Sequence, residues 1–194
     1  MPSLADALAE LKEDLGSRPV RIAAHSDIPF AVFRYSPEDE FALRRHLRLL
    51  AVNLKKDCSR SVLFVSLARL VWETAELFGI DDLFQTESLR GFDRAQQHLQ
   101  SILVSEDFKP AEESVLEKTA SLDPETDCVF LVRAGGLAPA VLRTSALFGA
   151  LENRTRVPVI LFYPGSLEFG TDLRFYDLPS QGGLGAYNYR VRIY

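Results

Sequence analysis

The chain has 194 residues, of which 47% are hydrophobic and 25% are charged, and its net charge is -5. This length and composition allow one domain to bury a sizeable core, and they exclude disordered and fibrous proteins. The negative net charge argues against a protein whose main task is to bind phosphate backbones.

The N-terminus, the apolar runs and the cysteines indicate the compartment. The N-terminus lacks the basic region of an export signal, and the longest apolar runs fall far short of the about 20 residues that span a bilayer. The 2 cysteines, Cys58 and Cys128, have no metal-binding spacing and are too few for a disulfide scaffold. We expect a cytoplasmic protein with two free thiols and no membrane association.

The first part of the chain predicts one helix and two short strands. Ser3 and Asp6 form a capping pair for an amphipathic helix that ends at Gly16. The β-rich pieces Val20–Ala23 and Phe30–Arg34 follow, separated by turn residues. The buried face of this helix is predicted from its leucines, which are Leu4, Leu8, Leu11 and Leu15.

A second amphipathic helix follows the strand at Phe30–Arg34. We predict that Ser36 caps it through its side chain, that Pro37 takes the first helical position and that Asp39 completes the capping pattern. Its buried stripe is predicted from Leu43, Leu47, Leu50 and Leu54.

The rest of the chain predicts three buried strands separated by helices. Short continuous apolar runs are typical of strands covered on both faces. The stretch from about 80 to 122 has no strand signal, and residues 168–185 form a turn-rich segment. We predict strands at 61–67, 128–133 and 157–165, and helices at 68–78, 92–103, 112–122 and 140–152.

Strands that alternate with helices predict an α/β fold, a mostly parallel sheet flanked by helices. We expect residues 1–194 to form a single α/β domain with a helical insertion at about 80–122. The order of elements also resembles a degenerate P-loop NTPase-like core without a phosphate loop, which is an analogy of fold alone.

The turn before the second helix is where many α/β proteins carry a phosphate loop. A working loop presents glycine amides, a lysine and a hydroxyl group for magnesium. Here the first helical turn holds Glu38, Asp39 and Glu40, whose charges favour the helix dipole and repel a triphosphate. The strands that end at Arg133 and Tyr163 also lack a terminal acidic residue for magnesium. We therefore expect no ATP hydrolysis of the usual kind and no cofactor.

An anion site near the strand ends is a separate hypothesis. Arg133, Gly135 and Gly136 follow a strand and could form an anion-binding nest, with Arg34 at the end of another strand. The same glycine pair is also typical of a tight strand-to-helix turn, because glycine adopts positive φ at no steric cost.

The histidines and the basic run predict no metal site and no nucleic-acid stripe. His25, His46 and His98 lack metal-binding spacing. His25 and Asp27 are a candidate acid/base pair, although two residues apart in a loop they are typical of turn hydrogen bonds. The basic run at 44–48 is predicted to be a solvated helix face that pairs with acidic residues one turn earlier.

The C-terminal YNYRVRIY alternates between two faces and predicts a half-exposed strand. Tyrosine and arginine dominate interface hot spots, and an edge strand can present them to a partner. We therefore take Tyr187, Tyr189, Arg190 and Arg192 as candidate partner-binding residues, with an ordinary edge strand as the alternative.

Four motifs in order along the chain resemble the BrxB family of BREX phage-defence components. They are AAHSDIPFAVFRYSPEDEFALRRHLRLLA, FLVRAGGLAPA, RVPVILFYPGSLE and YNYRVRIY. The resemblance implies a small cytoplasmic protein that acts in antiviral defence beside a DNA methyltransferase, a large ATPase and PglZ, an alkaline-phosphatase-like protein. It implies a subcomplex with PglZ and carries over no catalytic residues.

Two functions are compatible with these observations. The first is a noncatalytic adaptor that binds PglZ and other BREX subunits. The second is a nucleotide- or nucleic-acid-binding module, or a weak enzyme, that uses Arg34, Arg133 and the glycine turn in the crevice at the strand ends.

Overall fold

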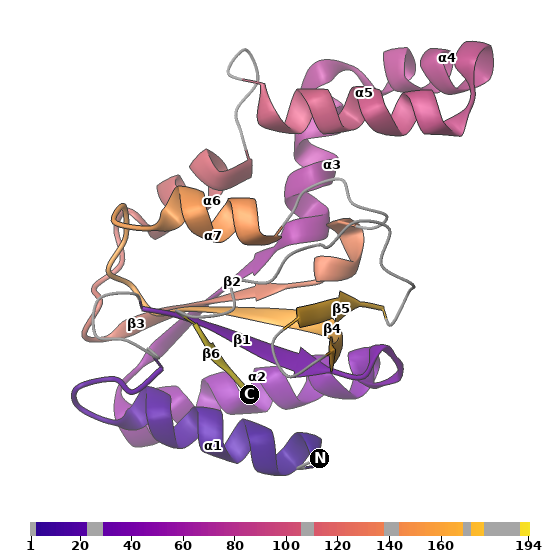
Figure 1. The fold of residues 1–194 in the computed structure, drawn as a ribbon. Coiled ribbons are helices and arrows are strands. Elements are labelled where there is room, and N and C mark those ends of the chain that lie inside the picture. Colours follow the sequence, from indigo (N-terminus) through magenta and orange to yellow (C-terminus); the bar gives the residue numbers. More distant parts are fainter. Residues whose placement is uncertain (1–2, 23–28, 106–110, 138–143, 169–171, 177–190) are drawn as a thin grey trace.

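The computed structural model describes residues 3–22, 29–105, 111–137, 144–168, 172–176 and 191–194. These residues form three layers, with a twisted sheet between two sets of helices (Figure 1). The strands are β1 Phe30–Tyr35, β2 Ser61–Ser66, β3 Asp127–Val132, β4 Val159–Glu168, β5 Asp172–Phe175 and β6 Arg192–Ile193. Their order in the sheet is β2-β3-β4-β1-β6, in which neighbours run parallel, and β5 pairs with β4 in the antiparallel direction. The predicted fold class, an α/β fold with a mostly parallel sheet flanked by helices, is confirmed.

Helices cover both faces of the sheet (Figure 1). The lower face carries α1 Leu4–Gly16 and α2 Glu40–Cys58, and the upper face carries α3 Leu67–Phe78, α6 Ala111–Thr119 and α7 Thr144–Leu151. Two further helices, α4 Ile80–Arg90 and α5 Phe92–Val104, continue from α3 and project away from the sheet. Within the described residues, the stretch predicted as a helical insertion thus contains α4, α5 and α6, of which α6 packs against the upper core.

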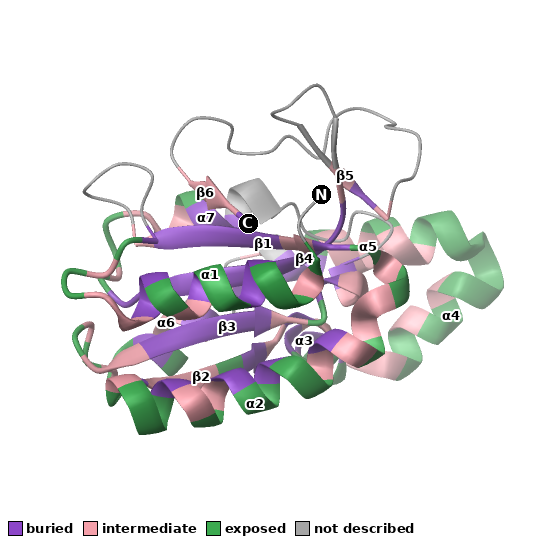
Figure 2. Cartoon of the chain, turned by 90° about the horizontal axis from the view of Figure 1, so that it is seen from below, coloured by how far each residue is buried: buried purple, intermediate pink, exposed green. Residues whose placement is uncertain are grey.

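Strict alternation along the strands builds two cores. In β1, Phe30 and Val32 face the upper helices, whereas Ala31 and Phe33 face the lower ones. Within the lower core, the aromatic rings of Phe33 and Phe162 pack against each other with their centroids 5.3 Å apart. Each fully buried large apolar side chain contributes about 1.5–3 kcal/mol, so the purple strands of Figure 2 carry much of the stability.

The two helices of the lower face follow the predicted leucine patterns. The capping box of Ser3 and Asp6 is present at the start of α1, and Leu8, Leu11 and Leu15 are buried. The α2 stripe is buried as predicted, and it consists of Leu43, Leu47, Leu50 and Leu54.

The predicted strand at Val20–Ala23 is wrong for its described part. Residues 20–22 are irregular, and Ala23 lies outside the described residues. The amide of Arg21 donates to the carbonyl of Asp14 at 3.2 Å, so this backbone completes the end of α1 instead of joining the sheet. Ile22 is 1% exposed and fills the lower core, which explains the apolar signal.

Side-chain capping by Ser36 is also wrong. Ser36 makes no capping side-chain hydrogen bond, and a 3-10 turn at Pro37–Asp39 precedes α2. The amide of Asp39 donates instead to the backbone carbonyl of Ser36 at 2.8 Å. The backbone carbonyl of Ser36 in this 3-10 turn therefore accepts the amide hydrogen bond that the sequence pattern assigned to the Ser36 hydroxyl group.

Three further differences concern the sheet and the projecting helices. β2 was predicted to be covered on both faces, but it pairs with β3 alone in the described sheet and Phe64 is 40% exposed. β5 lies in the segment predicted to be turn-rich, and α4 was not predicted.

No helix in the described part of the chain is both long and apolar enough to cross a bilayer.

Candidate functional site

The carboxyl ends of the parallel strands meet at one edge of the sheet, where the sequence predicted an anion site. Arg34 is half-buried near the end of β1, and its amide donates to the carbonyl of Tyr194 at 3.2 Å. Arg133 is exposed directly after β3, with a left-handed φ of 59°. β4 lies between these two strands, so their backbones are roughly 10 Å apart. The structure places both arginines at the same edge.

Close packing accounts for the glycine pair after β3. A Cβ at Gly135 would collide with the hydroxyl group of Tyr176, and one at Gly136 would collide with Ala68 in the first turn of α3. The amide of Gly136 already donates to the carbonyl of Arg133 at 3.0 Å. These glycines therefore permit close contact between elements, and their role in anion binding stays a prediction.

Aromatic side chains from the chain itself fill the space beside this turn. The rings of Tyr163 and Phe175 are 5.2 Å apart, and those of Phe175 and Tyr176 are 4.8 Å apart. The amide of Tyr176 donates to the carbonyl of Pro164 at 2.9 Å, which fixes the ring over Gly135. A ligand at the glycine turn would have to displace Tyr176.

A carboxylate and a guanidinium group occupy the place where a phosphate loop would lie. The hydroxyl group of Tyr35 donates to Glu40, and Nε of Arg44 donates to Oε1 of Glu40 at 2.7 Å, which confirms the predicted pairing along this helix. Burial, followed by the bond to Glu40, raises the pKa of Tyr35 far above its ordinary value. Burial and the charge of Glu40 also raise the pKa of Tyr176. Both phenols stay protonated at neutral pH, and the carboxylate disfavours a phosphate at this place.

The described residues bring no cluster of metal ligands together, and their buried thiol and one packed histidine are accounted for by the fold. No group of three or more His, Cys, Asp and Glu residues in the described ranges could hold a metal ion. Burial raises the pKa of the Cys128 thiol to about 12, so it is a poor nucleophile at neutral pH. His98 packs on Phe78 with a centroid distance of 4.9 Å, whereas the candidate pair His25 and Asp27 lies outside the described residues.

Of the four candidate partner-binding residues, Arg192 is described, and it contacts α1. Its Nη2 lies 2.6 Å from Oε1 of Glu10 and 2.9 Å from Oδ2 of Asp14. The hydroxyl group of Tyr194 donates to the same carboxylate of Asp14 at 2.8 Å. Arg192 thus joins β6 to α1, and its role toward a partner stays a prediction. The other three residues, Tyr187, Tyr189 and Arg190, lie outside the described residues.

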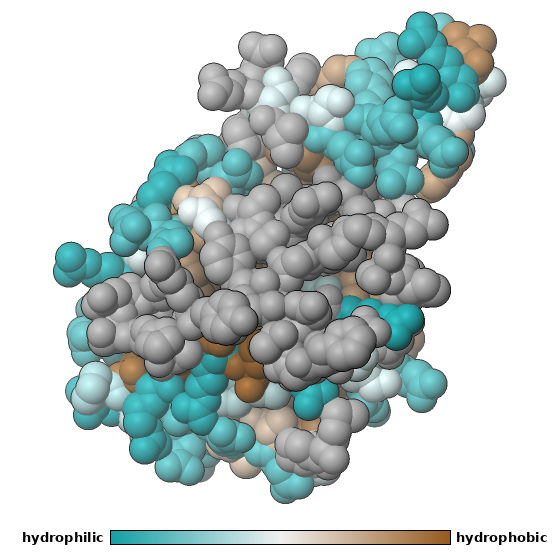
Figure 3. Space-filling view, viewed as in Figure 1, coloured by the Kyte–Doolittle hydropathy of each residue, from teal (hydrophilic) through white to brown (hydrophobic). Residues whose placement is uncertain are grey.

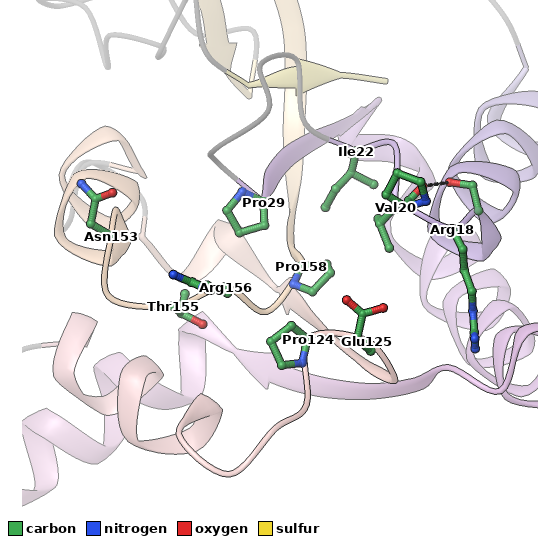
Figure 4. A pocket seen from close by; sticks show the side chains of 12 residues that line it. Arg18, Val20, Ile22, Pro29, Pro124, Glu125, Asn153, Thr155, Arg156 and Pro158 are labelled. Atoms are coloured by element: carbon green, nitrogen blue, oxygen red, sulfur yellow. Dashed lines mark hydrogen bonds between the residues drawn. The ribbon is translucent and has the colours of Figure 1, made fainter.

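A cavity of about 740 Å³ lies at the opposite edge, beside the starts of β1, β3 and β4. Figure 4 shows Pro29, Pro124 and Pro158 around it, with the side chains of Arg18 and Glu125 on one side. Proline has no amide hydrogen to offer a ligand, and the charged lining residues are two arginines on different sides, Arg18 and Arg156, and one glutamate, Glu125. The cavity shows no convergent set of polar groups that would define a ligand.

An apolar groove lies between α3 and the projecting arm, which we define as α4 and α5. Its volume is about 260 Å³, which is below the roughly 300–1,000 Å³ of small-molecule sites. Figure 3 shows brown hydrophobic side chains among teal ones on this arm, at the upper right. We call this groove the arm groove, and its main lining residues are Trp72, Ala75, Leu83, Phe84, Phe92 and Leu99.

Sequence reasoning did not single out the arm groove. Aromatic residues such as Trp72, Phe84 and Phe92 look like core residues in a sequence, but they are 52%, 57% and 59% exposed. The signal that the sequence offers is the weak helical pattern of residues 80–90. In the structure these residues form α4, which has no buried residue (Figure 2). α4 has no fully buried residue and exposes the large apolar side chains of Phe84 and Leu89, and such side chains indicate a surface for another molecule.

Comparison with known proteins identifies the family. A family model described as BREX protein BrxB matches residues 63–193, which is more than half of the 194 residues. No curated protein and no solved structure matches the chain. The matched range contains two of the four motifs on which the resemblance was based, all of a third except its last residue, Tyr194, and the arm groove. The chain therefore belongs to the BrxB family of BREX proteins.

Proposed function

We propose that this protein is a noncatalytic adaptor of BREX phage defence that binds the alkaline-phosphatase-like protein PglZ. Membership of the BrxB family directs attention to other BREX components as partners. An adaptor needs a surface that its own fold leaves uncovered, and it needs no reactive group. PglZ is the component that the resemblance of the motifs implies.

The observation that carries this proposal is the exposed apolar surface of α3 and the arm. A monomer has little reason to keep several large apolar side chains in water on one projecting element. Aromatic residues of this kind are enriched in protein interfaces. The exposed fractions are 52% for Trp72, 75% for Leu77, 57% for Phe84, 74% for Leu89 and 59% for Phe92.

The strand-end edge gives less support to the alternative, a nucleotide- or nucleic-acid-binding module. Tyr176 lies against Gly135, and the carboxylate of Glu40 lies where a phosphate loop would be. A phosphate at the glycine turn would meet the ring of Tyr176, and one beside Tyr35 would meet the carboxylate of Glu40, which already pairs with Arg44. Among the residues that the structure describes, none covers Phe84, Leu89 or Phe92 fully, and these side chains are 57%, 74% and 59% exposed.

Copurification of the full chain with PglZ tests the proposal. A stable complex, seen as one peak in size-exclusion chromatography that contains both proteins, is the expected result. Calorimetry with ATP, GTP and short DNA serves as the competing measurement. Saturable nucleotide or DNA binding that is lost in Arg133→Ala, together with no PglZ complex, would favour the alternative instead.

The candidate residues at the C-terminus are tested in the same assay. Substitution of Tyr187, Tyr189, Arg190 and Arg192 by alanine is expected to weaken the complex if these residues contact PglZ. Because Arg192 also binds Glu10 and Asp14, a stability measurement must accompany this variant. Unchanged copurification would remove these four residues from the interface.

A further inference from the structure

We propose that the arm groove binds a basic amphipathic helix of the partner protein. This inference rests on the proposed adaptor function and adds to it a defined surface and the chemistry of the segment that this surface receives. An apolar groove between helices is the usual receptor for a helix that presents large side chains at i, i+3, i+4 and i+7.

The shape of the arm groove suits a helix. Ala75, which is 5% exposed, forms its base on α3, and Trp72 stands beside it. Phe84 from α4 and Phe92 from α5 line it from the arm. α4 has 11 residues and is therefore about 16 Å long, so a helix that lies along it can contact it over about three turns.

A hydrogen bond holds one lining side chain in place. Nε1 of Trp72 donates to Oε1 of Glu76 at 2.6 Å, one helical turn further along α3. An indole ring held in this way loses little conformational entropy when a partner covers it. Trp72 is therefore suited to be an anchor contact of the interface.

α3 and the arm carry more acidic than basic residues, which favours a partner segment with a positive charge. From 67 to 104 the chain carries Asp or Glu at positions 73, 76, 81, 82, 87 and 93, and Arg at positions 69, 90 and 94. Arg69 already pairs with Glu73 at 2.7 Å, whereas Glu87 is exposed and lines the groove itself. An acidic lining residue on helices with a net acidic excess attracts lysine and arginine and disfavours an acidic helix.

The first test uses a defined probe instead of the unidentified segment. The probe is a fluorescent peptide of leucine and lysine, about 16 residues long, with its leucines on one helical face. The matched peptide carries glutamate in place of every lysine. Fluorescence anisotropy with the full chain is expected to show saturable binding of the lysine peptide and none of the glutamate peptide. Equal binding of both peptides would overturn the proposal.

Variants of the chain locate the bound peptide. Phe84→Ser is expected to weaken binding of the lysine peptide about tenfold or more. Phe41→Ser is the matched control, because Phe41 is 75% exposed on α2, outside the arm groove. Far-UV circular dichroism and the urea midpoint verify that both variants fold. Equal losses in the two variants, or no loss in Phe84→Ser, would overturn the assignment of the groove.

A charge reversal tests complementarity. Glu87→Lys is expected to weaken binding of the lysine peptide at least about threefold, with the larger effect at low salt. The same substitution is expected to leave the urea midpoint unchanged because Glu87 is exposed. An unchanged affinity at low ionic strength would contradict the role of charge.

Copurification of the variants with PglZ distinguishes failure of this inference from failure of the proposed function. A PglZ complex that survives both Phe84→Ser and Phe92→Ser would refute the arm groove as the interface while the adaptor function stands. Binding of the lysine peptide with the expected dependence on Phe84 and Glu87, but no PglZ complex, would support the groove and refute PglZ as the partner.

Discussion

Arg60 fastens three parts of the chain, and its removal should destabilise the protein strongly. Its side chain is buried, and the residue is 3% exposed. Nε donates to the carbonyl of Leu15 at 2.8 Å, Nη1 to those of Pro124 at 3.2 Å and Asp127 at 2.8 Å, and Nη2 to that of Glu125 at 2.9 Å. A net contribution of about 1 kcal/mol for each of these bonds gives about 4 kcal/mol for Arg60→Ala.

Urea unfolding followed by far-UV circular dichroism measures this loss. Arg60→Lys should fall between the wild type and Arg60→Ala, since an ammonium group keeps the charge without the fork of donors. Arg48→Ala, at an exposed position of α2, is the control and should change the free energy of unfolding by less than about 0.5 kcal/mol. A loss of less than about 1 kcal/mol in Arg60→Ala would refute the reasoning.

Three other substitutions address packing, pH and the joined ends of the chain. Gly136→Ala should cost about 1–3 kcal/mol in urea unfolding, because its methyl group would collide with Ala68; a neutral result would mean that the turn moves away easily. The folded pKa of Cys128 is raised from 9.0 to about 12, so the stability it contributes is present below pH 9.0 and lost as the pH rises toward about 12. Urea midpoints between these two pH values should therefore fall, and Cys128→Ala should reduce the slope; an unchanged slope would exclude the thiol as a cause. Asp14→Asn should cost about 1–3 kcal/mol in thermal unfolding, because the buried carboxylate accepts the hydroxyl group of Tyr194. An unchanged midpoint would show that the amide replaces it fully.

The sequence predicted the elements whose pattern is repeated and local. The leucine stripes of α1 and α2 recur at helical spacing, and burial of one face follows directly from that spacing. The apolar runs at 128–133 and 157–165 became β3 and β4, which are central strands with both faces covered. The pairing of Arg44 with Glu40 follows from the same helical geometry.

The remaining features depend on contacts between distant residues. Phe64 is exposed because β2 lies at the edge of the described sheet. A run of apolar residues predicts a strand, but it does not predict the position of that strand in the sheet. β5 exists because its backbone pairs with the extended end of β4. The arm groove was not predicted because an aromatic residue looks the same in a sequence whether it is exposed or buried. Only the three-dimensional packing shows that Phe84 is exposed and Phe33 is buried.

The contact between α1 and β6 has a consequence for how the protein opens. Asp14 binds Tyr194 and Arg192, and Arg192 also binds Glu10, so the earliest helix and the final strand share their polar contacts. Separation of either segment would expose the same buried carboxylate. In native-state hydrogen exchange, the amides of both segments should therefore report one common opening free energy and lose protection together.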